Sequence, residues 1–220
     1  MRIFRIFLAI VFFVFNKESA FAQHDFNGYL MPTLSINYQL SEKINQAIDI
    51  ENRNFAYLND EFVLKAIHVE VLNFTSLQIS ENQEAGFGIR YRMEADGNEE
   101  DELRLHQQYE WKRRKESLFE HRIRIEERFY ASSTIFRLRY KTGISIEPKN
   151  FCDVLTFSNE FAVEASRANQ TELEERLVIE ADWELFSATE LTIGTQYRFS
   201  DFTRSKEHNL FLTAKLSLSL

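Results

Sequence analysis

Cysteine, proline and glycine are all scarce in this chain of 220 residues, which holds 1 cysteine, 2 prolines and 6 glycines. The lone thiol, Cys152, excludes an intramolecular disulfide framework and a cysteine-rich metal site, and we expect no reactive role for it. With 44% hydrophobic and 14% aromatic residues, the composition also excludes a disordered or low-complexity chain. The sequence therefore predicts one ordered domain with a sizeable core.

Long apolar runs are lacking too, except at the N-terminus. There, two arginines precede a ten-residue apolar run (6–15), and an A-x-A cleavage site (20–22) follows it. A helix over this run would be about 15 Å long, whereas a membrane-spanning helix needs about 20 apolar residues. We therefore predict a cleaved signal peptide over residues 1–22 and a mature domain over residues 23–220.

Positive charge is in deficit. The chain has a net charge of −8, and without residues 1–22 it holds 23 basic against 33 acidic residues, a net charge of −10. Such an acidic protein is not expected to bind nucleic acid. Because no second long apolar run follows the signal peptide, an exported protein of this kind is either soluble or a β-barrel.

What the mature sequence does contain is an apolar residue at every second position over long stretches, which indicates strands. In the clearest stretch, Leu210, Leu212, Leu216, Leu218 and Leu220 share one face with an alanine. A helix would scatter these leucines around its circumference. Strand-like patterns occupy eleven segments: 28–40, 43–56, 61–79, 84–95, 101–112, 116–129, 133–147, 153–165, 171–184, 188–200 and 206–220.

The length of these segments favours a membrane barrel. Many run for 12 to 15 residues, whereas strands in soluble domains usually have about 5–6 and tilted membrane strands need about 9–11 within the bilayer. Short connections alternate with longer polar ones, as expected when one rim is periplasmic. We predict an all-β fold, a single antiparallel up-and-down transmembrane β-barrel in the cell outer membrane.

The number of strands follows less directly from the sequence. Eleven strands would make the first and last segments run in the same direction, and single-chain bacterial barrels have an even number of strands. We therefore expect about 12 strands, with 10 as the alternative. Residues 101–129 are rich in helix-forming Glu, Lys and Arg, but their apolar residues lie two apart, as in Tyr109/Trp111 and Ile123/Ile125. This spacing favours strands there.

Several of these segments resemble a known family. The stretches are GIRYR (88–92), ELRLHQQ (102–108), HRIRIEERF (121–129) and FRLRY (136–140), with MPTLS (31–35) and ENRNF (51–55) upstream. They are similar to an uncharacterised outer-membrane β-barrel family, domain of unknown function 2490, and the likeness extends over most of residues 28–220. The resemblance implies no catalytic residues. One departure is Leu220, since outer-membrane barrels usually end in an aromatic residue that the assembly machinery recognises.

Charged residues occupy the polar face of most predicted strands, and in a membrane barrel this face lines the interior. Between residues 84 and 147 the polar face predicts a lumenal basic wall of Arg90, Arg92, Arg104, Arg122, Arg124, Arg128, Arg137, Arg139 and Lys141. Between residues 153 and 184 it predicts a lumenal acidic wall of Glu160, Glu164, Glu172, Glu174, Glu180 and Asp182.

These features predict a non-enzymatic outer-membrane protein. The five histidines have no metal-ligand spacing, no catalytic motif is present, and we expect no cofactor and no metal. In the first interpretation, arginines and glutamates pair and fill the lumen, and the protein has a structural or loop-mediated role. In the second, the two walls line a narrow passive channel for small charged solutes or acidic oligosaccharides.

A third interpretation reverses the two faces. In a soluble periplasmic lipocalin-like barrel, the leucines would meet inside and the charges would cover the exterior. For the membrane interpretations, the expected partners are outer-membrane lipid and the outer-membrane assembly machinery, and the oligomeric state stays open.

Overall fold

The computed structural model of this chain describes residues 26–58, 61–95, 97, 99–114, 118–148, 151–166, 171–200 and 207–220. The segment predicted as a signal peptide, residues 1–22, lies outside the described residues. None of the described residues forms a helix of the length and apolarity that crossing a membrane requires.

Every one of the eleven segments with period-two alternation contains a strand, including the two within 101–129. The strands are β1 (Phe26–Ser41), β2 (Ile44–Leu58), β3 (Glu61–Ser80), β4 (Gln83–Glu94), β5 (Glu102–Arg114), β6 (Leu118–Phe129), β7 (Thr134–Ile146), β8 (Val154–Ser166), β9 (Glu172–Phe186), β10 (Thr189–Ser200) and β11 (Glu207–Ser219). The prediction of strands rather than a helix over residues 101–129 is confirmed.

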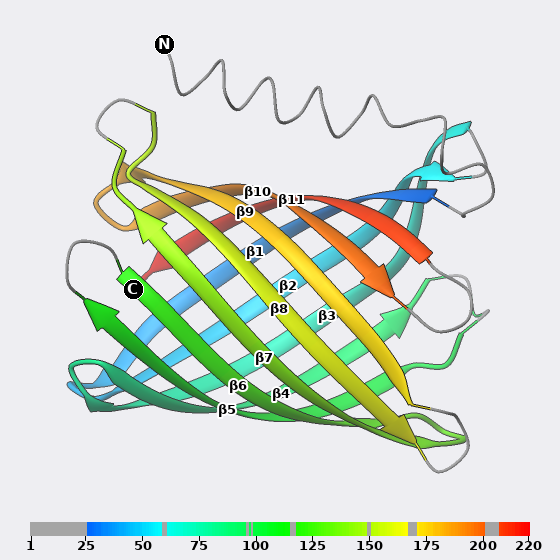
Figure 1. Cartoon of the computed structure of the whole chain (residues 1–220), viewed down its shortest axis with the longest axis horizontal. Helices are drawn as coiled ribbons and strands as arrows, with labels where there is room; N and C mark the ends of the chain where they lie inside the picture. The colour runs from blue at the N-terminus through cyan, green and yellow to red at the C-terminus, as the bar shows by residue number, and fades with distance from the viewer. Residues whose placement is uncertain are drawn as a thin grey trace.

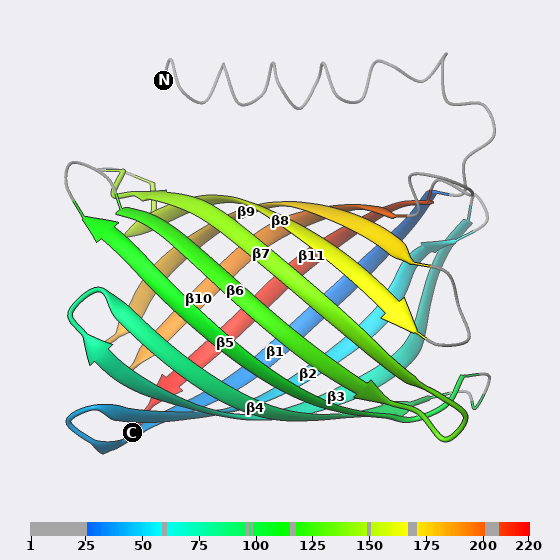
Figure 2. The same ribbon diagram turned by 60° about the horizontal axis from the view of Figure 1, so that its bottom comes forward.

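These strands form one closed barrel, in which each strand pairs with its sequence neighbours (Figures 1 and 2). The expectation of 12 or 10 strands is wrong, because the barrel has eleven. With an odd number, the first and last strands run in the same direction, and β1 pairs with β11 in parallel from Phe26↔His208 to Asn37↔Ser219. A parallel ladder satisfies the backbone groups of both strands, so the sheet closes without a twelfth strand.

The two rims of the barrel differ in their connections. At one rim, here called the turn rim, β1–β2, β3–β4 and β9–β10 are joined through residues 42–43, 81–82 and 187–188. The Ser41 hydroxyl oxygen accepts hydrogen bonds from the backbone N–H groups of Lys43 and Ile44, at 3.4 and 3.2 Å. The opposite rim, here called the loop rim, is where β1 and β11 begin and where β4 continues into the acidic loop 95–101.

The distribution of polar and apolar residues between the inside and the outside is the reverse of that in a soluble protein. Among the described residues, only five hydrophobic residues are buried, whereas fifteen polar or charged residues are. Along β7, the outward Phe136 and Leu138 are 54% and 51% exposed, while the inward Arg139 is 8% exposed. The apolar face of each strand therefore covers the outside of the barrel, and the charged face fills the inside.

Two glycines on β4 make room for aromatic rings inside the barrel. A Cβ atom at Gly88 would come within 2.2 Å of the His106 ring, and one at Gly86 within 2.2 Å of the Phe74 ring. These two rings stack on one another with their centroids 5.5 Å apart. The ring pair lies against the β4 backbone, an approach that only residues without a side chain allow.

We predict that Gly88→Ala lowers the free energy of unfolding by about 1–3 kcal/mol, because the buried His106 ring must shift to admit the new methyl group. Urea unfolding of the refolded protein would measure this loss. Ala85→Val, on the outward face of the same strand, is the control and should change the free energy by no more than about 0.5 kcal/mol. Equal effects of the two substitutions would contradict the tight packing over Gly88.

Candidate functional site

The predicted walls occupy the inner face of six consecutive strands. The basic wall lies on β4 (Arg90, Arg92), β5 (Arg104), β6 (Arg122, Arg124, Arg128) and β7 (Arg137, Arg139, Lys141), and the acidic wall lies on β8 (Glu160, Glu164) and β9 (Glu172, Glu174, Glu180, Asp182). The register keeps them on one face, since Arg104 is paired with both Arg90 and Arg128, and Lys141 with Glu160.

Four buried glutamates hold most of the interior arginines. Glu70, Glu102 and Glu126 are at most 1% exposed and Glu160 is 3% exposed. The arginines that form ion pairs with them are Arg90, Arg92, Arg104, Arg122, Arg124, Arg128, Arg137, Arg139 and Arg176. Because a buried charge is stable only when it is paired and hydrogen-bonded, each glutamate depends on its arginines and they on it.

Glu102 has the densest set of donors. Its Oε1 accepts hydrogen bonds from Nε of Arg104 at 2.6 Å and Nε of Arg128 at 3.0 Å. Its Oε2 accepts from Nη2 of Arg128 at 2.9 Å and from the Tyr130 hydroxyl at 2.8 Å. Arg128 also donates through Nη1 to Glu164 at 2.8 Å. One carboxylate thus links β5 to β6, and Arg128 extends the link to β8.

Arg139 connects two of the buried carboxylates. It donates through Nη1 to Glu126 at 2.7 Å and through Nε to Glu160 at 2.9 Å. Glu160 in turn accepts from Nη2 of Arg122 at 2.9 Å and lies 3.4 Å from Nη1 of Arg176. Charges of opposite sign therefore alternate from β6 to β9, joined by charge-assisted hydrogen bonds.

The two predicted walls are consequently interleaved rather than separate. Glu160 and Glu164 of the acidic wall are the partners of arginines in the basic wall. Among the described residues, no ion pair joins Glu180 or Asp182 to the basic wall, and Asp182 instead accepts a hydrogen bond from Thr192 at 2.6 Å. The opposite charges of the two walls are thus largely neutralised by one another between β6 and β8.

Two further members of the walls pair elsewhere. Lys141 forms an ion pair with Glu120 of β6 at 2.7 Å. Glu174 pairs with Arg176 and accepts a hydrogen bond from Ser200 at 3.4 Å. These contacts extend the network toward both rims and along β9 and β10.

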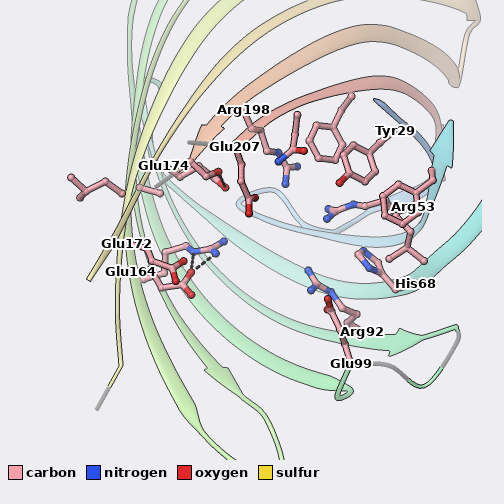
Figure 3. A pocket seen from close by; sticks show the side chains of 18 residues that line it. Tyr29, Arg53, His68, Arg92, Glu99, Glu164, Glu172, Glu174, Arg198 and Glu207 are labelled. Atoms are coloured by element: carbon pink, nitrogen blue, oxygen red, sulfur yellow. Dashed lines mark hydrogen bonds and ion pairs between the residues drawn. The ribbon is translucent and has the colours of Figure 1, made fainter. Parts of the chain in front are cut away.

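A cavity of about 320 Å³ lies inside the barrel toward the loop rim (Figure 3). Its charged lining consists of Arg53, His68, Arg92, Glu99, Arg137, Glu164, Glu172, Glu174, Arg198 and Glu207. Tyr29, Phe55 and Phe211 form its aromatic lining, and the rings of Tyr29 and Phe211 stack across the β1–β11 seam with centroids 4.5 Å apart. The size is at the lower end of the range for small-molecule sites, so the cavity is the candidate functional site.

Sequence reasoning placed Arg92, Arg137, Glu164, Glu172 and Glu174 in the interior but missed the rest of the cavity. Most of the missed residues come from β1, β2, β3, β10 and β11, which the two predicted walls did not include, while Glu99 lies in the β4–β5 loop and Ala162 and Leu173 lie on β8 and β9. A signal was present for Arg198, which lies on the polar face between Tyr197 and Phe199. Applying the same alternation of inward and outward side chains to β10 would have placed Arg198 inside the barrel.

A group of side chains with metal-ligand chemistry lies beside the cavity. Glu51, His68 and Glu70 offer ligand atoms within 4.8 Å of one another. Glu70 is already paired with two arginines of β4, and Arg53 lies 3.6 Å from Glu51. Because these guanidinium groups repel a cation and occupy the carboxylates, the expectation of no bound metal stays as a prediction.

The acidic loop between β4 and β5 is fastened to its surroundings. Asp101 accepts hydrogen bonds from the Glu94 backbone N–H at 3.0 Å and the Tyr91 hydroxyl at 2.8 Å, and these bonds hold the pKa of Asp101 below its usual range. Glu100 accepts from the backbone N–H and the hydroxyl of Ser132, both at 3.1 Å. Glu100 therefore joins the described part of this loop to the β6–β7 connection.

Comparisons with known proteins place the chain in a family and go no further. No curated protein and no solved structure matches it. The family model described as a protein of unknown function, DUF2490, matches residues 31–209, which include all the interior residues of β2 to β10 described above. The chain belongs to the DUF2490 family.

Proposed function

We propose that the mature chain is a non-enzymatic β-barrel that spans the Gram-negative outer membrane, with a structural or loop-mediated role. The observation that carries this proposal is the inverted polarity of the barrel, with an apolar outside and a charged, ion-paired inside. In water, an exterior of this kind would leave much apolar surface exposed, whereas lipid covers it at no cost.

The dimensions of the barrel support the same placement. Most strands have 12 to 16 residues, and a strand of this length tilted by about 45° reaches about 30 Å along the barrel axis, close to the thickness of a bilayer core. Trp111 and Trp183 lie on the outward face near the turn rim, and Trp183 donates a hydrogen bond to the Phe151 carbonyl at 2.9 Å. Such rings suit the lipid headgroup level.

Export would follow from the predicted signal peptide, residues 1–22, and insertion from the outer-membrane assembly machinery. The soluble lipocalin-like interpretation needs an apolar interior that can hold an apolar ligand. The described interior carries glutamates and arginines instead, which disfavours that interpretation.

Fractionation of cells that express the protein tests the membrane proposal. We expect recovery in the outer-membrane fraction, with a shift in gel mobility between unheated and heated samples that reports a folded barrel. Recovery in the soluble periplasm would contradict the proposal. Glu102→Ala, which opens the ion-pair network, is a useful companion because it should reduce the folded form without changing the signal peptide.

A second candidate function is a narrow passive channel for small charged solutes. The cavity toward the loop rim favours it, because a volume of about 320 Å³ can hold a small charged solute. Planar-bilayer recording of the refolded protein tests it, and discrete conductance steps are the expected result for a channel. If the barrel is shown to insert but no conductance steps are recorded, the structural or loop-mediated role would be the better proposal.

A further inference from the structure

Arg198 differs from the other interior arginines. Among the described residues, no carboxylate lies within 4.0 Å of its guanidinium group, and its single hydrogen bond is a long one, 3.5 Å to the Gln196 side chain. Its Nε is buried and has no hydrogen-bond partner in the described part of the chain. A half-buried guanidinium group with no carboxylate partner in the described part of the chain favours a ligand of negative charge.

Arg53 lies near Arg198 and is only weakly engaged. Its Nη2 is 3.6 Å from Glu51, and its Nε is likewise buried without a partner among the described residues. The guanidinium carbons of Arg198 and Arg53 lie 3.9 and 5.2 Å from the centroid of the Phe211 ring. Phe211 is 3% exposed and stacks on Tyr29, so the rings fix where the two cations sit.

We propose that a small solute bearing one oxyanion group, a carboxylate or a phosphate, binds between Arg53 and Arg198 in the loop-rim cavity. Figure 3 shows both side chains reaching into the cavity beside Tyr29. Two guanidinium groups can present parallel N–H donors to the oxygens of such an anion. Both are already positioned by the aromatic pair, so little side-chain freedom is lost on binding.

The rest of the cavity limits what the solute can be. Its lining also includes five glutamates, Glu99, Glu164, Glu172, Glu174 and Glu207. In Figure 3, Glu164, Glu172 and Glu174 lie on the wall across from Arg53. With these five glutamates against four arginines, Arg53, Arg92, Arg137 and Arg198, the lining offers no further net positive charge to a second anionic group, and a volume of about 320 Å³ excludes a long chain. We therefore expect a small monoanion and no tight binding of polyanions.

Saturation-transfer NMR on the refolded protein in deuterated detergent tests the site. Acetate and acetamide, its neutral analogue, are observed through their methyl protons. Inorganic phosphate, which has no carbon-bound protons, is scored by its competition with acetate at mildly acidic pH, where it is mainly a monoanion. We expect acetate and phosphate to bind and acetamide to bind at least about tenfold more weakly, because charge-assisted hydrogen bonds are lost. Arg198→Gln and Arg53→Gln should each weaken acetate binding by about tenfold or more.

Lys215→Gln is the matched control, since it removes one positive charge from the same interior below the cavity. Lys215 lies 3.8 Å from Asp49 and does not line the cavity, so acetate binding should be unchanged. Circular dichroism and gel mobility confirm folding of each variant, and Arg53→Gln serves if Arg198→Gln does not fold. The proposal is overturned if wild-type protein binds neither anion, if acetamide matches acetate, or if both arginine variants retain binding.

The oxyanion site belongs to the barrel interior and does not rest on the membrane placement. A protein recovered from the soluble periplasm that still binds acetate through Arg198 would contradict the membrane proposal and leave the site intact. Recovery in the outer membrane without anion binding would support the membrane proposal and contradict the oxyanion site.

Discussion

Replacing Glu102 by alanine should lower the free energy of unfolding by about 3–5 kcal/mol, the range for removing one partner of a buried ion pair. The carboxylate is 0% exposed and accepts hydrogen bonds from Arg104, Arg128 and Tyr130. Its loss leaves the buried Arg104 without the carboxylate it pairs with and leaves Arg128 with Glu164 alone. Reversible urea unfolding of the refolded barrel, followed by circular dichroism, would measure the loss.

Glu110→Ala is the matched control, because Glu110 lies on the same strand and the same face as Glu102. Its ion pair with Lys112 is 3.6 Å long, and the Lys112 side chain is 45% exposed. Such a pair contributes at most about 1 kcal/mol. If both alanine variants lost the same free energy, the ion-pair network would not be the main source of interior stability.

Leu138→Lys should cost about 2–4 kcal/mol when the protein folds into lipid vesicles, the range for a lysine at the bilayer midplane on the outer face of a barrel. Leu138 lies close to the middle of β7, and its side chain points outward with 51% exposure. The lysine would need to leave the hydrocarbon or carry its charge into it. Urea titration in vesicles would measure the change.

The comparison that makes this result decisive is Phe186→Lys. Phe186 is the last residue of β9, at the turn rim, and is 74% exposed. Near the membrane interface a lysine costs only about 0–1 kcal/mol. If the barrel were soluble, both substitutions would be surface changes of about 0.5 kcal/mol or less, and a small, equal effect at Leu138 would argue against a lipid-facing exterior.

Much of the fold was predictable because the alternation along each strand is local. The polar and apolar faces of β7 and β11 can be assigned from the sequence alone, and so can the position of β5 and β6 in a region of helix-forming residues. Strand number was not predictable in the same way. Whether β1 pairs with β11 in parallel depends on how the whole sheet curves and closes, and no local pattern along Phe26–Ser41 or Glu207–Ser219 reports it.

The site was predictable only in part, for a related reason. The alternation of residues along each strand identified which arginines point into the barrel, but it does not identify their partners. Arg139 joins Glu126 to Glu160, and Arg128 reaches past β7 to Glu164. These contacts depend on strand tilt and on side-chain reach, neither of which the alternation encodes. Nor does the alternation show that Arg198 has no carboxylate partner among the described residues, because this depends on where the neighbours on β1, β2 and β11 lie.

The parallel pairing of β1 and β11 also restricts how the two ends of the barrel domain can be connected. β1 begins at the loop rim and β11 ends at the turn rim, so Phe26 and Leu220 lie at opposite rims (Figure 2). In a barrel with an even number of strands, a short hairpin could join the two termini to give a circular permutant. Here the linker would have to travel the full height of the barrel, about 30 Å, which takes roughly nine extended residues. A protein fused before Phe26 and a protein fused after Leu220 would accordingly lie at opposite rims of the barrel.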